Sequence, residues 1–283
     1  MTFREALKYS LETVLRPCVS SASPQRRAFI LHEVLPSQQG AYAELLAMLA
    51  RHPHWDWTVT FDDGYVSSAQ AIRKVAPERG IFFVCPEYIN RAGSSSWEQF
   101  FYQNFLRTES LSHPEVRAAF APASWQQLRE LVKLGYRIGS HSMTHARLSS
   151  LTSTKELERE ILGSAEVLED QLQIPVKWFA HPFGDVASIS ELALRLIRKR
   201  YEFFFPGVRG NMHLSRTPGL HWRDTVHFHW GTAHIEFLLS GGLDWRYWKT
   251  RRRLARLWRM FEDVRGGTLN NVSEVGPRSN AAL

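Results

Sequence analysis

Short apolar runs alternate with segments of helical periodicity, and this alternation limits the possible fold more than any other feature of the chain. The runs are rich in β-branched and aromatic residues, as buried strands are, and the segments between them repeat apolar residues every three or four positions. We expect strands at 28–31, 57–61, 81–85, 136–139, 176–180 and 201–205, and helices at 42–49, 69–75, 124–134, 153–172 and 189–199. Such alternation predicts parallel βαβ units.

Polar residues of the kinds that act in catalysis or bind metals follow directly after several of these strands. A parallel α/β barrel assembles its active site from the loops at the carboxyl ends of its strands, so this placement favours a barrel. Beyond Gly207 the pattern weakens, because the candidate strands at 214–220 and 225–229 lie too close together for a full helix between them. The sequence therefore predicts an irregular or incomplete (β/α) barrel.

The chain divides into four parts by composition. Residues 1–26 read as a short helix and a polar connector, and 27–240 as the barrel. Within the barrel, residues 90–122 form a long aromatic and polar excursion, which is typical of a lid or groove wall. The pattern of residues 241–264 predicts a basic amphipathic helix. Residues 265–283 are small and polar, which predicts a disordered tail.

Composition also limits the compartment and the partners. Glu5 and Glu12 interrupt the N-terminus, so it does not read as a secretion signal, and the chain has no apolar stretch long enough to span a membrane. The cysteines, Cys18 and Cys85, form no disulfide framework, which favours a reducing, cytoplasmic home. The net charge of +7 suggests an anionic partner of some kind.

Two adjacent carboxylates, Asp62 and Asp63, stand at the end of the strand at 57–61 and are followed by Gly64. Successive side chains of a strand point to opposite faces, so the two can share one site only if the chain leaves the strand there, which glycine permits. The alternative is an ordinary surface turn, since Asp-Gly is a common hairpin signal.

Two further stretches follow later strands. His141 and His145 are four residues apart and would face the same way on one helical turn or in a tight loop, as metal ligands must. The third stretch, 179–184, has proline and glycine that fix its backbone path, and by itself it could be a turn. Together, two histidines and one aspartate can hold Zn²⁺ or a similar divalent ion and leave room for water and substrate.

With these three stretches in this order, the chain resembles the polysaccharide deacetylase family, also called the NodB-homology or carbohydrate esterase 4 group. The resemblance covers about residues 27–205 and implies a metal-dependent amide hydrolase. It implies that Asp62 is the general base and that the metal ligands are Asp63, His141 and His145. The resemblance also places Phe183 near the oxyanion, with His32 and His181 as further substrate-binding candidates.

The match departs from the family pattern in three places. The third motif of the family carries an arginine where this chain has Ala180, and the aspartate and tryptophan pattern that pairs with that arginine has no counterpart. The histidine that protonates the leaving amine has four candidates, which are His181, His221, His227 and His229.

We therefore expect a deacylase that removes an acetyl or formyl group from an amino sugar of a nucleotide- or lipid-linked saccharide in cytoplasmic surface-glycan assembly. The alternative is a carbohydrate-binding relative that has lost turnover. The basic helix at 248–261 either docks its apolar stripe on the barrel or meets anionic lipid at the inner membrane face. Nucleic acid is not expected, because no recognition motif accompanies the basic residues.

Overall fold

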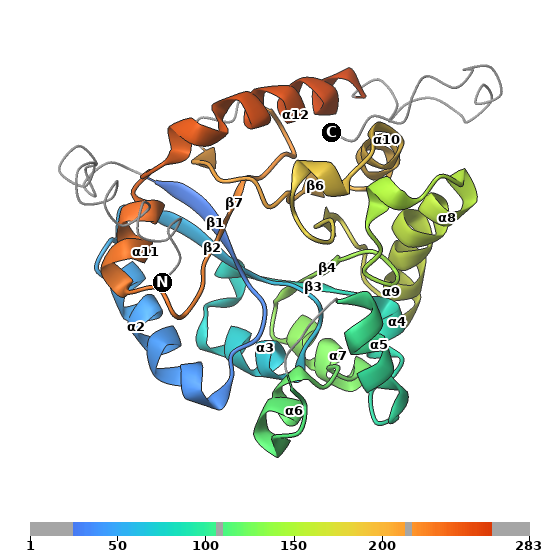
Figure 1. The fold of residues 1–283 in the computed structure, drawn as a ribbon, viewed down its shortest axis with the longest axis horizontal. Helices are drawn as coiled ribbons and strands as arrows, with labels where there is room; N and C mark the ends of the chain where they lie inside the picture. Colours follow the sequence, from blue (N-terminus) through green and yellow to red (C-terminus); the bar gives the residue numbers. More distant parts are fainter. Residues whose placement is uncertain (1–24, 106–109, 213–216, 262–283) are drawn as a thin grey trace.

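Seven parallel strands form one curled sheet in the computed structural model, which describes residues 25–105, 110–212 and 217–261 (Figure 1). The strand order is β6-β5-β4-β3-β2-β1-β7. The strands are β1 (Arg26–Leu31), β2 (Asp56–Phe61), β3 (Gly80–Val84), β4 (Arg137–Ser140), β5 (Trp178–Phe179), β6 (Phe203–Phe204) and β7 (Arg223–Thr225). The predicted irregular (β/α) barrel is confirmed.

Helices surround the sheet on its outer side (Figure 1). They are α2 (Gln39–Ala50), α3 (Val66–Ala71), α4 (Pro86–Ile89), α5 (Ser96–Asn104), α6 (Pro114–Phe120), α7 (Trp125–Lys133), α8 (Thr154–Glu158), α9 (Ser164–Leu172), α10 (Glu191–Arg200), α11 (Thr232–Leu239) and α12 (Trp248–Met260). Ser124 caps α7 as expected, since its side chain accepts a hydrogen bond from the Gln127 N–H at 3.2 Å.

The later strands differ from the sequence prediction. Strands β5 and β6 have only two residues each, and β7 begins at Arg223 and overlaps the expected segment 225–229 only at Thr225. Leu220 contributes a single bridge to Phe204. Strand β7 was hard to find because it contains Arg223 and Asp224, two charged residues that are disfavoured in strands unless each is paired.

The barrel is open between β6 and β7, which are the two edges of the described sheet. Helix α12 lies across this side of the molecule (Figure 1). Its Trp258 is fully buried, stacks on Phe204 of β6 at 5.3 Å and donates to the Pro218 carbonyl at 3.0 Å. The apolar stripe of this helix therefore packs on the barrel, as the first of the two expectations for it required.

The excursion at 90–122 has an aromatic core of its own beside the barrel. Its helices α5 and α6 bury rings against Tyr65 and Tyr88, and the cluster includes Trp97, Phe100, Phe101, Phe105 and Phe120. This packing holds the segment against the loops that end β2 and β3. The predicted N-terminal helix and C-terminal tail lie outside the described residues, apart from the first residues of β1.

Candidate metal and catalytic site

The backbone turns sharply where the two carboxylates follow β2. The Asp62 N–H still donates to Leu31 O at 3.0 Å, as in a strand, but Asp63 has φ of 75° and Gly64 has φ of +104°. The positive φ of Gly64 favours glycine, and a Cβ added there would stand 2.9 Å from Ile89 Cδ1, so the end of that side chain would have to shift. The turn lets Asp62 and Asp63 line the same cavity.

His141 and His145 lie in a loop after β4 rather than on a helix. Ser142 and His145 have φ values of 63° and 65°, in the left-handed region that non-glycine residues seldom occupy. Four of the six non-glycine residues with positive φ in the described chain belong to the three predicted stretches: Asp63, Ser142, His145 and Phe183. Such strain typically gathers where a site must be held in one geometry.

The three predicted metal ligands converge. Their donor atoms all lie within 4.8 Å of one another, and Nε2 of each histidine is 3.4 Å from Asp63 Oδ1. The other ring nitrogen of each histidine donates to a backbone carbonyl, from His141 Nδ1 to Ala180 O at 2.8 Å and from His145 Nδ1 to Asn104 O at 2.9 Å. These bonds fix the tautomer that leaves each Nε2 lone pair free for a metal, so the residues fit a divalent ion.

The charges of this group also suit a cation. Burial would raise the pKa of Asp63, but His141 and His145 hold it far below its ordinary value. Burial lowers the pKa of His145 to about 4, so this imidazole is neutral at neutral pH. For His141, burial is outweighed by Asp62 and Asp63, which raise the pKa. A proton therefore competes with a metal ion for His141.

Glu160 fixes the loop that carries His141 and His145 by hydrogen bonds to Thr144. It is 4% exposed and accepts from the Thr144 N–H at 2.9 Å and from the Thr144 hydroxyl at 2.8 Å. Glu160 lies in a π-helical turn, Arg159–Gly163, which interrupts the helix that was expected to run unbroken through 153–172. The π turn places this carboxylate against the loop, as such turns do at functional sites.

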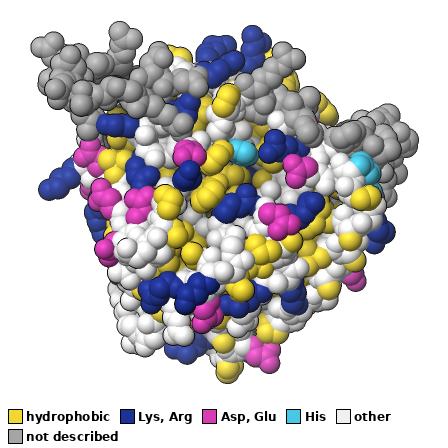
Figure 2. Space-filling view, turned by 180° about the vertical axis from the view of Figure 1, so that it is seen from behind, with side chains coloured by type: hydrophobic (Ala, Val, Ile, Leu, Met, Phe, Trp, Pro, Cys, Tyr) yellow, Lys and Arg dark blue, Asp and Glu magenta, His cyan; other side chains and the backbone are white. Residues whose placement is uncertain are grey.

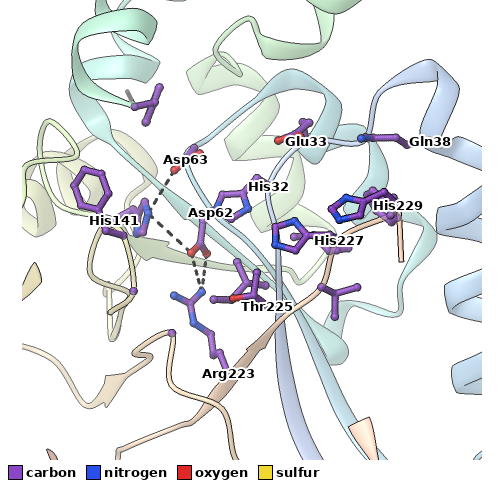
Figure 3. Close-up of a pocket in the computed structure, with 18 of the residues that line it drawn as sticks. His32, Glu33, Gln38, Asp62, Asp63, His141, Arg223, Thr225, His227 and His229 are labelled. Atoms are coloured by element: carbon purple, nitrogen blue, oxygen red, sulfur yellow. Dashed lines mark hydrogen bonds and ion pairs between the residues drawn. The ribbon is translucent and has the colours of Figure 1, made fainter. Parts of the chain in front are cut away.

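Arg223 of β7 binds Asp62 and was missed from the sequence. Its Nη1 donates to Asp62 Oδ1 at 2.7 Å and Oδ2 at 2.9 Å (Figure 3). The same nitrogen donates to Thr60 Oγ1 at 3.0 Å. Burial would raise the pKa of Asp62, but Arg223, with His141, lowers it instead. Asp62 is thus held as a carboxylate beside the metal ligands.

Although no arginine stands at Ala180, Asp62 has an arginine partner from another strand. Ala180 is buried and leaves no charge at that point, and Arg223 reaches Asp62 from 161 positions further along the chain. The next residue, Asp224, pairs instead with Arg27 at 2.9 Å and Arg209 at 3.3 Å, as strand alternation requires. In the sequence, the only indication that Arg223 could be the partner of Asp62 is that a charged residue stands inside a strand.

The third stretch forms a tight turn at the cavity wall. Phe183 has φ of 66°, and its ring is 4.8 Å from that of His145. Gly184 packs so closely on Gly207 that an added Cβ would be 3.0 Å from Gly207 Cα. The Phe183 N–H donates to no residue within the described chain.

A cavity of about 640 Å³ joins these groups. Its lining includes Asp62, Asp63, His141, His145, Phe183 and Arg223. His32 lies beside Asp62, and His227 and His229 line the cavity further out (Figure 3). Phe105, from the 90–122 excursion, forms part of one wall and lies 4.8 Å from the His145 ring.

Two of the four candidate acids do not line this cavity. His181 is buried and donates from Nε2 to Asp185 O at 2.9 Å, and His221 stacks on Phe205 at 4.7 Å. In Figure 3 the ring of His227 lies between His32 and His229, on the carboxylate side of His229. Of the four, only His227 and His229 are in a position to meet a molecule in the cavity.

The chain matches the family model described as polysaccharide deacetylase over residues 50–200, more than half its length. This match includes the two carboxylates, both histidines of the metal group and the Phe183 turn. Arg223 and His227 lie beyond its end. No curated protein sequence matches the chain.

Several solved structures share the fold. IcaB from Ammonifex degensii is 19% identical, with a TM-score of 0.57 over 77% of this chain and 98% of that one. The Streptococcus pyogenes deacetylase PplD, solved in complex with acetate, is 13% identical, with a TM-score of 0.53 over 76% and 98%. A polysaccharide deacetylase from Bacillus cereus, BC0361, is 16% identical, with a TM-score of 0.52 over 76% and 68%.

Proposed function

The chain belongs to the polysaccharide deacetylase family of metal-dependent amide hydrolases, and we propose that it removes an acetyl or formyl group from an amino sugar of a carrier-linked saccharide. The observation that carries the proposal is the buried Asp63, His141 and His145 group beside a second carboxylate that an arginine keeps ionised. This combination offers a metal site with a separate base.

Asp63, His141 and His145 would hold the ion. When bound, a divalent ion supplies Lewis acidity and lowers the pKa of bound water from about 15.7 to about 7. Asp62 then takes the proton of the attacking water, which general-base catalysis makes worth roughly 10²- to 10⁴-fold. Arg223 orients the Asp62 carboxylate and keeps it ionised, because both carboxylate oxygens accept hydrogen bonds from the same guanidinium nitrogen.

The remaining steps fall to groups on the cavity wall. The Phe183 N–H donates to the acyl oxygen as that oxygen becomes negative. We assign the leaving-group acid to His227, which lines the cavity on the side opposite His141 in Figure 3. Proton transfer from an imidazole lets the amine depart as a neutral group.

The cavity supports a short substrate. A volume of about 640 Å³ is typical of small-ligand pockets and fits one or two sugar units. A nucleotide- or lipid-linked amino sugar would present such a unit, with its carrier outside the cavity. Saccharides of this kind are assembled in the cytoplasm, where we propose that the protein acts, with Zn²⁺ as its metal.

The second candidate is a sugar-binding relative without turnover, and the substitution at Ala180 is the observation that favours it. A protein that only binds sugar has no need of a carboxylate kept ionised at the metal site, so the Arg223–Asp62 pair weighs against this reading.

Acetate release tests the proposal. The Zn²⁺-loaded protein is incubated with a nucleotide-linked N-acetyl amino sugar, a polyprenyl-phosphate-linked one and a polymer of N-acetylglucosamine, beside an Asp62→Asn variant with matched zinc content. We expect release from a carrier-linked substrate and a fall of about 10²- to 10⁴-fold in the variant. Equal release by both proteins would remove Asp62 from the mechanism, and release from the polymer alone would overturn the substrate class.

A further inference from the structure

The positive charge of the chain is concentrated in one segment, residues 245–260, here called the basic segment. It contains seven Lys and Arg residues and no Asp or Glu. The whole chain has 35 Lys and Arg against 28 Asp and Glu, so removing these seven leaves 28 of each sign. The net charge of +7 therefore equals the charge of this segment alone.

The same segment also carries most of the exposed large apolar side chains. The described residues include six of these, and four are in the basic segment: Trp245 at 62% exposed, Tyr247 at 38%, Trp248 at 49% and Met260 at 63%. The two tryptophans lie under cations, with Arg246 6.0 Å from the Trp245 ring and Lys249 5.6 Å from the Trp248 ring. Exposed aromatic rings next to cations are typical of surfaces that enter a bilayer interface.

The inner side of the segment is fixed to the barrel, so its outer face has a defined orientation. Leu254 and Trp258 are buried, and Arg198 of α10 packs 4.8 Å from the Trp258 ring. Arg251 donates to Arg209 O at 2.6 Å and to Asp244 O at 3.0 Å. The apolar stripe is thus used in docking, and the exposed aromatic residues near the start of α12 are additional to it.

The outward cations are left for a partner. Lys249, Arg252, Arg253, Arg256 and Arg259 are exposed, and none forms an ion pair with a residue in the described ranges. Lys and Arg side chains gather along the upper edge of the molecule in Figure 2, the edge on which α12 lies in Figure 1.

We propose that the basic segment is a membrane-docking face that binds a bilayer containing anionic lipid. Cations near such a surface each gain about 1 kcal/mol, and tryptophan and tyrosine settle at the headgroup level. A second copy of the chain would bring like charges together. A single-stranded nucleic acid needs a groove, and none of these residues lines the site cavity. The inference does not rest on the proposed function, since it concerns a different face.

Vesicle flotation of the full chain tests this. The probes are vesicles of phosphatidylcholine alone and vesicles with about one third phosphatidylglycerol, at low and high salt. We expect binding to the anionic vesicles and loss of binding at high salt. Replacing three cations by Arg252→Gln, Arg253→Gln and Arg256→Gln should weaken partitioning about 100-fold, since each cation accounts for roughly fivefold. Trp248→Ser should weaken it further.

Matched control variants remove exposed cations and an exposed apolar side chain outside the basic segment. Lys133→Gln, Lys155→Gln and Arg195→Gln take three exposed cations from other helices or helix ends, and Leu134→Ser removes a side chain that is 52% exposed. These should bind vesicles like the unchanged protein, and all variants should retain its zinc content and melting temperature. Equal binding by the two triple variants would overturn the proposal. So would binding to a DNA duplex that excess anionic vesicles fail to displace.

Discussion

Replacing Arg223 by methionine should disable the base without emptying the metal site. Arg223 contacts Asp62 and Thr60 but none of the three metal ligands. With the guanidinium gone, burial is opposed by His141 and His32 but no longer by Arg223, so the pKa of Asp62 should rise. A larger fraction of Asp62 would then be protonated at neutral pH and unable to accept a proton.

The size of the effect follows from the burial of the pair. The side chain of Arg223 is 0% exposed and that of Asp62 is 4% exposed. Removing one partner of such a pair costs about 3–5 kcal/mol of folding free energy, and losing a general base costs about 10²- to 10⁴-fold in kcat. We expect kcat of Arg223→Met to fall within that range at pH 7 and to recover partly as pH rises, because Asp62 ionises again.

The assay is the pH dependence of acetate release, with zinc content measured in parallel. Arg27→Met is the matched control, because Arg27 is also buried and paired, with Asp224 and Asp244, but points away from the cavity. It should lose stability and keep the original pH profile. Arg223→Lys should keep a cation and fall between the two. An unchanged profile in Arg223→Met, or the same profile in both methionine variants, would refute the role of Arg223.

Three more predictions follow from the site. Zn²⁺ affinity should fall from pH 7.5 to pH 5.5 because the raised pKa of His141 lets a proton compete, while His145, with a pKa of about 4, stays neutral; titration against a chelating dye would show this, and a flat profile would contradict it. His227→Ala should lower kcat about 10²- to 10⁴-fold and regain activity with added imidazole, whereas His229→Ala should change it little; the reverse order would reassign the acid. Gly64→Ala should cost about 1–3 kcal/mol by thermal unfolding because of its φ of +104°, whereas Gly40→Ala, with nothing within 4 Å of the added Cβ, should be neutral or stabilising.

The fold and the metal group were readable from the sequence because their signals are local. Apolar runs marked the strands, and Asp63, His141 and His145 each followed one, so parallel topology brought them to the same end of the sheet. Of the four positive φ values at the site, those of Asp63 and Phe183 were indicated by the glycines that follow them, Gly64 and Gly184, and those of Ser142 and His145 were not.

Arg223 could not be found in this way because its role depends on contact between β7 and the end of β2. A charged residue lowers the strand propensity of its own segment, and only the carboxylate of Asp62, 161 positions earlier, explains its burial. The π turn that places Glu160 against Thr144 could not be predicted either, because the apolar residues keep a helical spacing through it. Long-range polar pairing decided the features that local pattern missed.

A crystal structure grown with Zn²⁺ tests the central claim most directly. We predict one ion held by Asp63, His141 and His145, with Asp62 outside the ligand set and still bound by Arg223. An ion held at another place, or one ligated by Asp62 with Arg223 turned away, would contradict the separation of metal ligand and base on which the account depends.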